Sequence, residues 1–241
     1  MQKPGSVVGA QTGSRAESAG TVLAIVLDHY VGVSEGIDSL SRLCGTSGLS
    51  LIVWSPHGVI PHELREPFSI AVGGCRFRDA LPDSPAQFLR YQAVYVPIAM
   101  TGLVYGLVHG DDRDPVVRTI LMAVYLGVPV ALLGIGFNPA HRAWDVSGLG
   151  RAQAIWPDEW RTQTKRLRGL GVDVLKDPLD ALGWVHERLG GPKLLDVGMV
   201  EMFHVRGINE VMVGVSTVIT PGAQDQLRHY GMKIKIGGGL R

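Results

Sequence analysis

The sequence has few cysteines, few aromatic residues and almost no net charge. Only two cysteines, Cys44 and Cys75, occur among 241 residues, and neither belongs to a CxxC motif. This argues against a disulfide scaffold or a thiolate metal site, and we expect two reduced, mostly buried thiols in a cytoplasmic protein. The 23 basic and 22 acidic side chains give a formal charge of +1. Dedicated nucleic-acid-binding proteins usually carry a basic excess, so we expect no nucleic-acid partner.

Long hydrophobic runs are also missing. No uninterrupted apolar run approaches the roughly 18–20 residues that a membrane-spanning helix needs. The early apolar stretch 21–27 ends at Asp28, which makes it too short for the hydrophobic region of a secretory signal. We therefore expect no membrane partner. Residues of the broad apolar class still make up 46% of the chain, which is enough for a substantial core and excludes intrinsic disorder as the main state.

Short apolar runs alternate with helical patterns over most of the chain. The apolar runs are bounded by Gly, Pro or a charged residue and predict strands at 21–27, 49–55, 91–97, 128–134 and 171–178. The helical patterns lie at 34–44, 115–126, 159–171 and 180–191. Asp114 is the expected N-cap of the second helix, with Pro115 in its first turn. Buried strands that alternate with helices indicate a parallel sheet covered on both faces, and we predict a doubly wound, Rossmann-like or flavodoxin-like α/β fold.

Two segments differ in composition from this α/β region. Residues 1–20 are rich in Gly, Ser and Ala without an apolar period, and we predict a flexible tail there. Near residue 193 a new pattern begins, with a strand-like run at 211–220, a helix at 220–231 capped by Thr220, and an alternating strand at 232–236. We therefore divide the chain into a tail (1–20), an α/β domain (21–192) and a small C-terminal α+β module (193–241).

Parallel sheets of this kind bind ligands beyond the carboxyl ends of their strands. The loop after the first strand carries Gly32 and Ser34 at the opening of a helix, where backbone N–H groups and a hydroxyl can cradle a phosphate. An ordinary strand–helix turn is the alternative. Ser55 and His57 follow the second strand, where they are placed either to contact a ligand or to form a solvated turn.

Two further loops follow the third and fourth of these strands. The small residues of 97–103 would let a flat ligand approach the backbone, and Asn138 in 134–139 could read the polar edge of a ring. No acidic residue ends the second strand, so a mononucleotide-sized ligand is favoured over a dinucleotide. No GxSxG, HExxH or acid-rich metal loop is present. The sequence therefore identifies no metal site and no catalytic residue.

The stretch 91–133 resembles a flavoprotein family that includes the homo-oligomeric flavin-containing cysteine decarboxylases and the flavoprotein component of dipicolinate synthase. That family typically has an apolar strand, then Pro-Ala-[Ser/Thr]-Ala-Asn-Thr-Ile, a Gly…Asp stretch, a helix and a second strand that opens with Val-Pro. The matching residues are Pro97, Ala99, Thr101, Leu103, Asp112 and Pro129. The first strand with its turn and Ser55-Pro56 are also similar, and the resemblance covers roughly residues 20–180.

The resemblance implies an FMN site, often between subunits of a trimer or larger homo-oligomer. It places Gly32, Ser34 and Ser55 at the phosphate. It places Pro97, Ala99 and Thr101 at the isoalloxazine, with Asn138 as a looser assignment. Two departures stand out: Thr101 and Gly102 occupy the positions of the family's Asn and Thr, and residues 83–87 lack the histidine that decarboxylating members carry before the third strand.

The missing histidine favours hydride or electron chemistry by the flavin over decarboxylation. The Thr101-Gly102 departure motivates the alternative, a non-catalytic assembly or adaptor protein that keeps the flavoprotein fold without its cofactor. In the C-terminal module, residues 211–234 are similar to a short segment of several proteins encoded with bacterial microcompartments. This implies a location inside such a compartment, whereas a simple strand–helix–strand ornament is the structural alternative.

Overall fold

The computed structural model describes residues 20–44, 49–56, 59–60, 65–88, 90–156, 158–189, 194–205, 209–214 and 217–237. Within this part, no helix is long and apolar enough to cross a membrane. The predicted tail at 1–20 lies outside the described residues except for Gly20, which begins the first strand.

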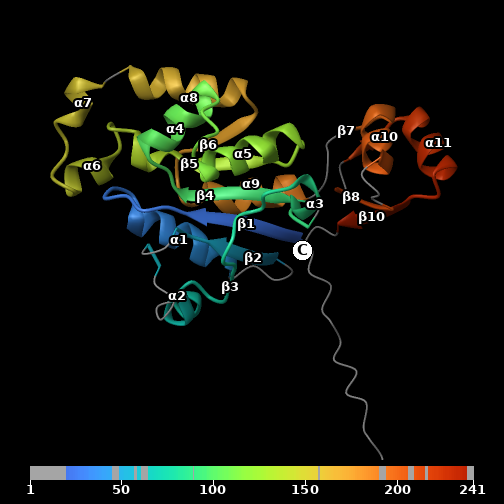
Figure 1. The fold of residues 1–241 in the computed structure, drawn as a ribbon, viewed down its shortest axis with the longest axis horizontal. Helices are drawn as coiled ribbons and strands as arrows, with labels where there is room; N and C mark the ends of the chain where they lie inside the picture. Colours follow the sequence, from blue (N-terminus) through green and yellow to red (C-terminus); the bar gives the residue numbers. More distant parts are fainter. Residues whose placement is uncertain are drawn as a thin grey trace, which may run out of the picture.

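A six-stranded, all-parallel sheet forms the centre of the α/β region (Figure 1), in the order β3-β2-β1-β4-β5-β6. The strands are β1 (Gly20–Val26), β2 (Leu49–Trp54), β3 (Arg76–Phe77), β4 (Ala93–Ile98), β5 (Val130–Leu133) and β6 (Val172–Leu175). Every residue of β4 and β5 is buried, as expected where both faces of a parallel sheet are covered. The predicted doubly wound α/β fold is therefore confirmed.

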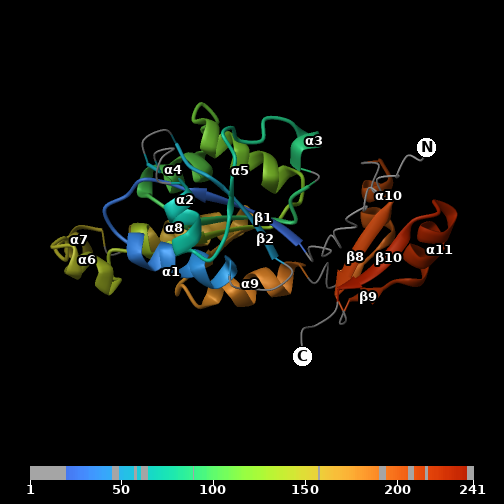
Figure 2. The same ribbon diagram turned by 90° about the horizontal axis from the view of Figure 1, so that it is seen from below.

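Helices cover both faces of this sheet (Figures 1 and 2). α1 and α9 pack on one face, in an apolar core that includes Leu40 and Val185. α4, α5 and α8 pack on the other face, in a second core that includes Leu107 and Leu167. The helices of this region are α1 (Val33–Cys44), α2 (Arg65–Ala71), α3 (Pro85–Phe88), α4 (Thr101–His109), α5 (Pro115–Tyr125), the 3-10 helix η2 (Gly134–Phe137), α6 (Arg142–Val146), α7 (Ala152–Ile155), α8 (Glu159–Gly169) and α9 (Asp180–Leu189).

The predicted strands and long helices of the α/β region are present. Asp114 caps α5, its carboxylate accepting the N–H groups of Val116 and Val117, and Pro115 stands at the first position. Such a cap stabilises a helix by about 1 kcal/mol. The interpretation of 97–103 as a loop is only partly right, because Thr101 begins α4.

The C-terminal residues build two small parallel sheets with an apolar core of their own, which includes Val200, Val213 and Leu227. Their elements are β7 (Leu194–Leu195), α10 (Val197–Val205), β8 (Glu210–Gly214), β9 (Val218–Ile219), α11 (Pro221–His229) and β10 (Lys233–Gly237). This is the predicted α+β appendage. The single strand predicted at 211–220 is wrong, because β8 pairs with β10 whereas β9 pairs with β7. The boundary at residue 193 stays a prediction, since 190–193 lie outside the described residues.

Candidate functional site

The order of the strands locates the candidate site. β1 lies between β2 and β4, so the chain winds outward from β1 in one direction and from β4 in the other. Ligands of open α/β sheets bind at such a switch point, beyond the carboxyl ends of the strands. The seven residues predicted to hold a ligand all lie at this edge, at or after the ends of β1, β2, β4 and β5: Gly32, Ser34, Ser55, Pro97, Ala99, Thr101 and Asn138.

The turn after β1 packs tightly against its neighbours. Gly32 has a φ of +82°, and a Cβ added to it would lie 3.0 Å from Ile135 Cγ2. A Cβ on Gly36 would lie 2.8 Å from the carbonyl oxygen of Pro97. Only glycine fits at Gly32 without strain, because an L side chain disfavours positive φ. The first turn of α1 is thereby held directly against the ends of β4 and β5.

Ser34 occupies the first turn of α1, where backbone N–H groups have no partner within the helix. Its side chain is exposed, and Ser34 Oγ donates a hydrogen bond to Glu35 Oε2 over 2.8 Å. A carboxylate is favourable at a helix N-terminus, as a phosphate would be. Glu35 therefore occupies part of the environment that the sequence predicts for an anionic ligand.

Ser55 carries an unsatisfied hydroxyl at the end of β2. The residue is only 5% exposed, and its Oγ has no hydrogen-bond partner within the described residues. Leaving a buried polar atom unpaired costs about 1–3 kcal/mol. This buried hydroxyl lies at the carboxyl edge of the sheet, where it is available to a further hydrogen-bond partner.

β4 ends in an irregularity that contains Pro97. Ala24 pairs with Tyr95 and Val26 with Ile98, so one residue of β1 opposes two of β4. Proline is tolerated at such a bulge because it has no N–H to donate to the ladder. The bulge redirects the chain just before Ala99, which is buried, and Thr101, which is exposed at the start of α4.

Three of the strand-end segments meet at Gly136. A Cβ on Gly136 would lie 2.3 Å from the carbonyl oxygen of Ala99 and 2.8 Å from His29 Cδ2. His29 Nε2–H donates to the carbonyl oxygen of Gly136 over 2.8 Å, and the indole Nε1–H of Trp144 donates to Ile135 over 2.9 Å. His29, Gly136 and Trp144 were not among the predicted site residues, although the first two lie in loops that were predicted to carry the site.

The N-terminus of α4 is open toward solvent. Met100 precedes the helix and offers no side-chain cap, and Thr101 is exposed. A Cβ on Gly102 would meet no atom within 4 Å. The packing of the described residues therefore does not require glycine at this position.

Asn138 ends η2 and stabilises its own turn. Its Oδ1 accepts the N–H of Ala140 over 3.1 Å, an arrangement common where a short polar side chain shapes a loop. The side chain is half-buried. The Asn138 carboxamide oxygen is thus engaged within its own turn, and its assignment to a ligand stays a prediction.

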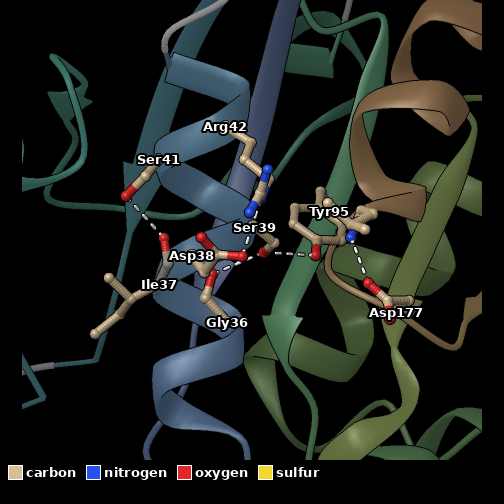
Figure 3. Close-up of polar contacts among 9 residues, drawn as sticks. Gly36, Ile37, Asp38, Ser39, Ser41, Arg42, Tyr95 and Asp177 are labelled. Carbon is tan, nitrogen blue, oxygen red and sulfur yellow. Dashed lines mark hydrogen bonds and ion pairs between the residues drawn. The ribbon is translucent and has the colours of Figure 1, made fainter.

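A buried hydrogen-bond chain fixes α1 against β4 (Figure 3). Tyr95 Oη donates to Ser39 Oγ over 2.8 Å, and Ser39 Oγ donates to the carbonyl oxygen of Gly36 over 2.7 Å. Burial raises the pKa of the Tyr95 phenol well above its usual range, and the negative charge of Asp180 acts in the same direction, although the Ser39 hydroxyl opposes them. Tyr95 therefore stays neutral and sets the distance between the two elements at the switch point.

Within the part of the chain that the structure describes, no three His, Cys, Asp or Glu side chains are grouped to hold a metal ion. The chemistry that the described edge offers is instead that of backbone N–H groups, hydroxyls and one imidazole, around closely packed glycines. Backbone N–H groups and hydroxyls of this kind can bind an anionic group, although the Glu35 carboxylate stands among them.

No family model matches the sequence, and no curated protein is significantly similar to it. Among solved structures, the chain is similar to phenylacrylic acid decarboxylase from Aquifex aeolicus, with a TM-score of 0.43 and 14% identity over 70% of this chain and 96% of that one. It is also similar to a dodecameric FMN-dependent UbiX-like decarboxylase from Escherichia coli O157:H7, with a TM-score of 0.42 and 11% identity over 77% of this chain and 94% of that one.

Proposed function

We propose that the chain is an FMN-binding flavoprotein whose site is the carboxyl edge of its parallel sheet at β1, β2, β4 and β5. The observation that carries the proposal is the buried Ser55 hydroxyl, which lacks a partner within the described residues. It lies at the edge where a doubly wound sheet binds nucleotides. The choice of FMN comes from the residue pattern of 91–133, which resembles a flavoprotein family.

The phosphate would lie at the first turn of α1. Gly32 lets the backbone turn tightly there, the N–H groups after it supply hydrogen bonds and a partial positive charge, and Ser34 and Ser55 supply hydroxyls. To take part, Ser34 Oγ must leave Glu35 Oε2, to which it donates in this structure.

The isoalloxazine would lie along Pro97, Ala99 and Thr101, with Asn138 near its rim. Bound FMN supplies the redox-active ring, which exchanges electrons or hydride. The protein would position this ring through the bulge at Pro97 and through the contact between Ala99 and Gly136. His29, held by its hydrogen bond to Gly136, would keep the segments after β1 and β5 together.

Redox or electron-transfer chemistry is the preferred activity, and decarboxylation is less favoured. The resemblance would require a histidine within residues 83–87, and these residues contain none. They lead into and form part of α3. Within them, Gln87 Nε2 donates a hydrogen bond to Asp83 Oδ1. We further propose a homo-oligomer of three or more copies and a cytoplasmic location. The resemblance of 211–234 supports a place inside a bacterial microcompartment.

A second function, that of an assembly or adaptor protein without cofactor, is favoured by one observation. The Glu35 carboxylate stands in the first turn of α1 and accepts the Ser34 hydroxyl, so the chain itself places a negative charge where a phosphate would bind. Thr101 is exposed, and a Cβ on Gly102 would meet no atom within 4 Å. Neither position is therefore shaped by a contact that only a flavin site would need.

The absorption spectrum of the purified full chain distinguishes the two functions. We expect bands at about 370 and 450 nm that persist after FMN is added and excess removed, because these belong to bound flavin. A Thr101→Trp variant should lose them, whereas Thr162→Trp, which alters an exposed threonine of α8 outside the site, should keep them. If the protein is colourless and cannot be loaded with FMN, the flavin assignment is refuted and the adaptor function remains.

A further inference from the structure

An imidazole stands at the candidate site, although residues 83–87 contain no histidine. His29 lies in the segment between β1 and α1 and is half-buried. Its Nε2–H donates to the carbonyl oxygen of Gly136 over 2.8 Å. A Cβ on Gly136 would lie 2.8 Å from His29 Cδ2 and 2.3 Å from the carbonyl oxygen of Ala99. The imidazole therefore stands close to Ala99, where the proposed function places the isoalloxazine.

Two aromatic rings hold this imidazole in place. The Tyr30 ring packs against it at 4.3 Å between ring centroids, and the Trp144 indole stands edge-on to it at 6.4 Å. Trp144 is buried and donates from its indole N–H to the carbonyl oxygen of Ile135 over 2.9 Å, whereas Tyr30 is 69% exposed. His29 is thus fixed at the boundary between the core and the solvent.

The hydrogen bond to Gly136 determines which ring nitrogen carries the proton. A carbonyl oxygen can only accept, so Nε2 of His29 carries a hydrogen whether the ring is neutral or charged. In the neutral ring, Nδ1 then has the free lone pair. Nδ1 lies across the ring from the Gly136 contact and has no hydrogen-bond partner within the described residues. His29 can therefore gain or lose a proton at Nδ1 without breaking the bond that holds it.

No charged side chain of the described residues is paired with this imidazole. The titratable side chains of the neighbouring segment, of the first turn of α1 and of the α6 region are those of Asp28, Tyr30, Glu35, His141, Arg142 and Asp145. None of them forms a hydrogen bond or an ion pair with His29, and Tyr30 touches it through its ring. A charged ligand that reaches Nδ1 would therefore be the main influence on the charge of His29.

We propose that His29 takes up a proton at Nδ1 when a flavin bound at this edge is reduced, and that it thereby raises the reduction potential of the flavin. This inference rests on the proposed function. Two electrons from a reductant such as dithionite and one proton from water convert FMN to its anionic reduced form. A second proton from water binds His29 Nδ1, and the imidazolium stabilises the negative charge of the reduced ring. Reduction thus consumes two electrons and two protons, whereas without His29 it consumes two electrons and one proton.

The experiment measures the midpoint potential of the full-length, FMN-loaded protein between about pH 7 and 8, where a histidine can change its charge. We expect the potential to fall with pH about twice as steeply in the unaltered chain as in His29→Gln. Glutamine keeps an N–H donor for Gly136 but cannot take up a proton, so this variant should still retain FMN. His229→Gln changes an exposed histidine of α11 and should behave like the unaltered chain.

A second measurement needs no variant and decides the question if His29→Gln fails to fold. In ¹⁵N NMR spectra of the unaltered protein, neutral His29 should carry its proton on Nε2, and its Nδ1 should take up a proton at higher pH with reduced FMN than with oxidised FMN. The contact with the Tyr30 ring identifies the His29 signals.

The outcomes separate this inference from the proposed function. If the chain retains FMN but its potential falls with pH no more steeply than that of His29→Gln, the inference is overturned and the flavin site stands. The same holds if neutral His29 carries its proton on Nδ1, or if its proton uptake is the same with reduced and with oxidised FMN. If the unaltered chain retains no FMN, the proposed function is overturned and this inference with it.

Discussion

Replacing Gly136 by alanine should test the close approach on which the candidate site depends. The new Cβ would lie 2.3 Å from the carbonyl oxygen of Ala99, whereas ordinary contact begins at 3.4 Å. The segments after β4 and β5 must therefore separate by about 1 Å, because the obstructing atom belongs to the backbone and cannot rotate away. His29 Cδ2, at 2.8 Å from the same Cβ, would also be displaced, and with it the hydrogen bond to Gly136.

Overpacking of this kind destabilises a protein by about 1–3 kcal/mol. For a chain of this length that corresponds to a fall in melting temperature of about 3–10 °C, which circular dichroism can follow. FMN affinity should fall by about tenfold or more, because a displacement of 1 Å at a binding site is enough to misplace the ligand.

Gly169→Ala is the matched control. Gly169 ends α8, outside the candidate site, and a Cβ there would meet no atom within 4 Å. This variant should keep its melting temperature, or raise it slightly because alanine favours helix, and should bind FMN as the unaltered chain does. If Gly136→Ala behaves like Gly169→Ala in unfolding, the approach of Gly136 to Ala99 is absent from the protein. If it unfolds earlier but still binds FMN normally, the ligand does not use this edge.

Three further predictions concern single groups. Glu35→Gln should strengthen FMN binding by about fivefold at low salt, since it removes a negative charge from the phosphate end; a fluorescence titration measures this. Tyr95→Phe should lower the free energy of unfolding by about 1 kcal/mol in urea, because Ser39 loses its hydrogen-bond donor, and an unchanged midpoint would contradict the buried chain. The effect of Cys44 lowers the pKa of the Cys75 thiol to about 7, so the rate of Cys75 alkylation by iodoacetamide should rise with pH through about 7, and in Cys44→Ala this rise should move to higher pH.

Much of the fold follows from patterns that act locally. The buried strands read as continuous apolar runs because both of their faces are covered. Asp114 and Thr220 were predictable as N-caps because each places a side-chain oxygen near N–H groups two or three residues along the chain. These interactions span a few residues and leave their signature in the sequence.

α4 shows where such patterns stop being informative. It buries one face, which carries Leu103, Val104 and Leu107, but the apolar Tyr105 lies on its exposed side, so its sequence lacks the clear one-sided spacing of a surface helix. Gly106 lowers helix propensity, yet a Cβ there would lie 2.7 Å from Val117 Cγ2, which makes glycine the residue that the helix pair needs. The two-residue strand β3 is shorter than any pattern can identify.

The candidate site divides in the same way. It was predictable that the loops after β1, β2, β4 and β5 lie along one edge, because a parallel sheet presents the carboxyl ends of its strands there. The contact of His29 with Gly136 was not, because it joins residues 107 positions apart and depends on the order of β1, β4 and β5 in the sheet. Nothing in the local sequence of either loop shows that Gly136 must be small to accommodate Ala99.

The arrangement of α1 and α4 explains why Glu35 separates the two proposed functions. Both helices begin at the same edge of the sheet, so the partial positive charges of their first turns favour an anion there. In the chain alone, Glu35 supplies that negative charge and engages the Ser34 hydroxyl. A flavin phosphate would have to displace this carboxylate, whereas an adaptor without cofactor would keep it. Removing the charge should therefore improve FMN binding if the edge is a flavin site, and should lower only stability, by about 0.3–1 kcal/mol, if the edge serves the fold alone.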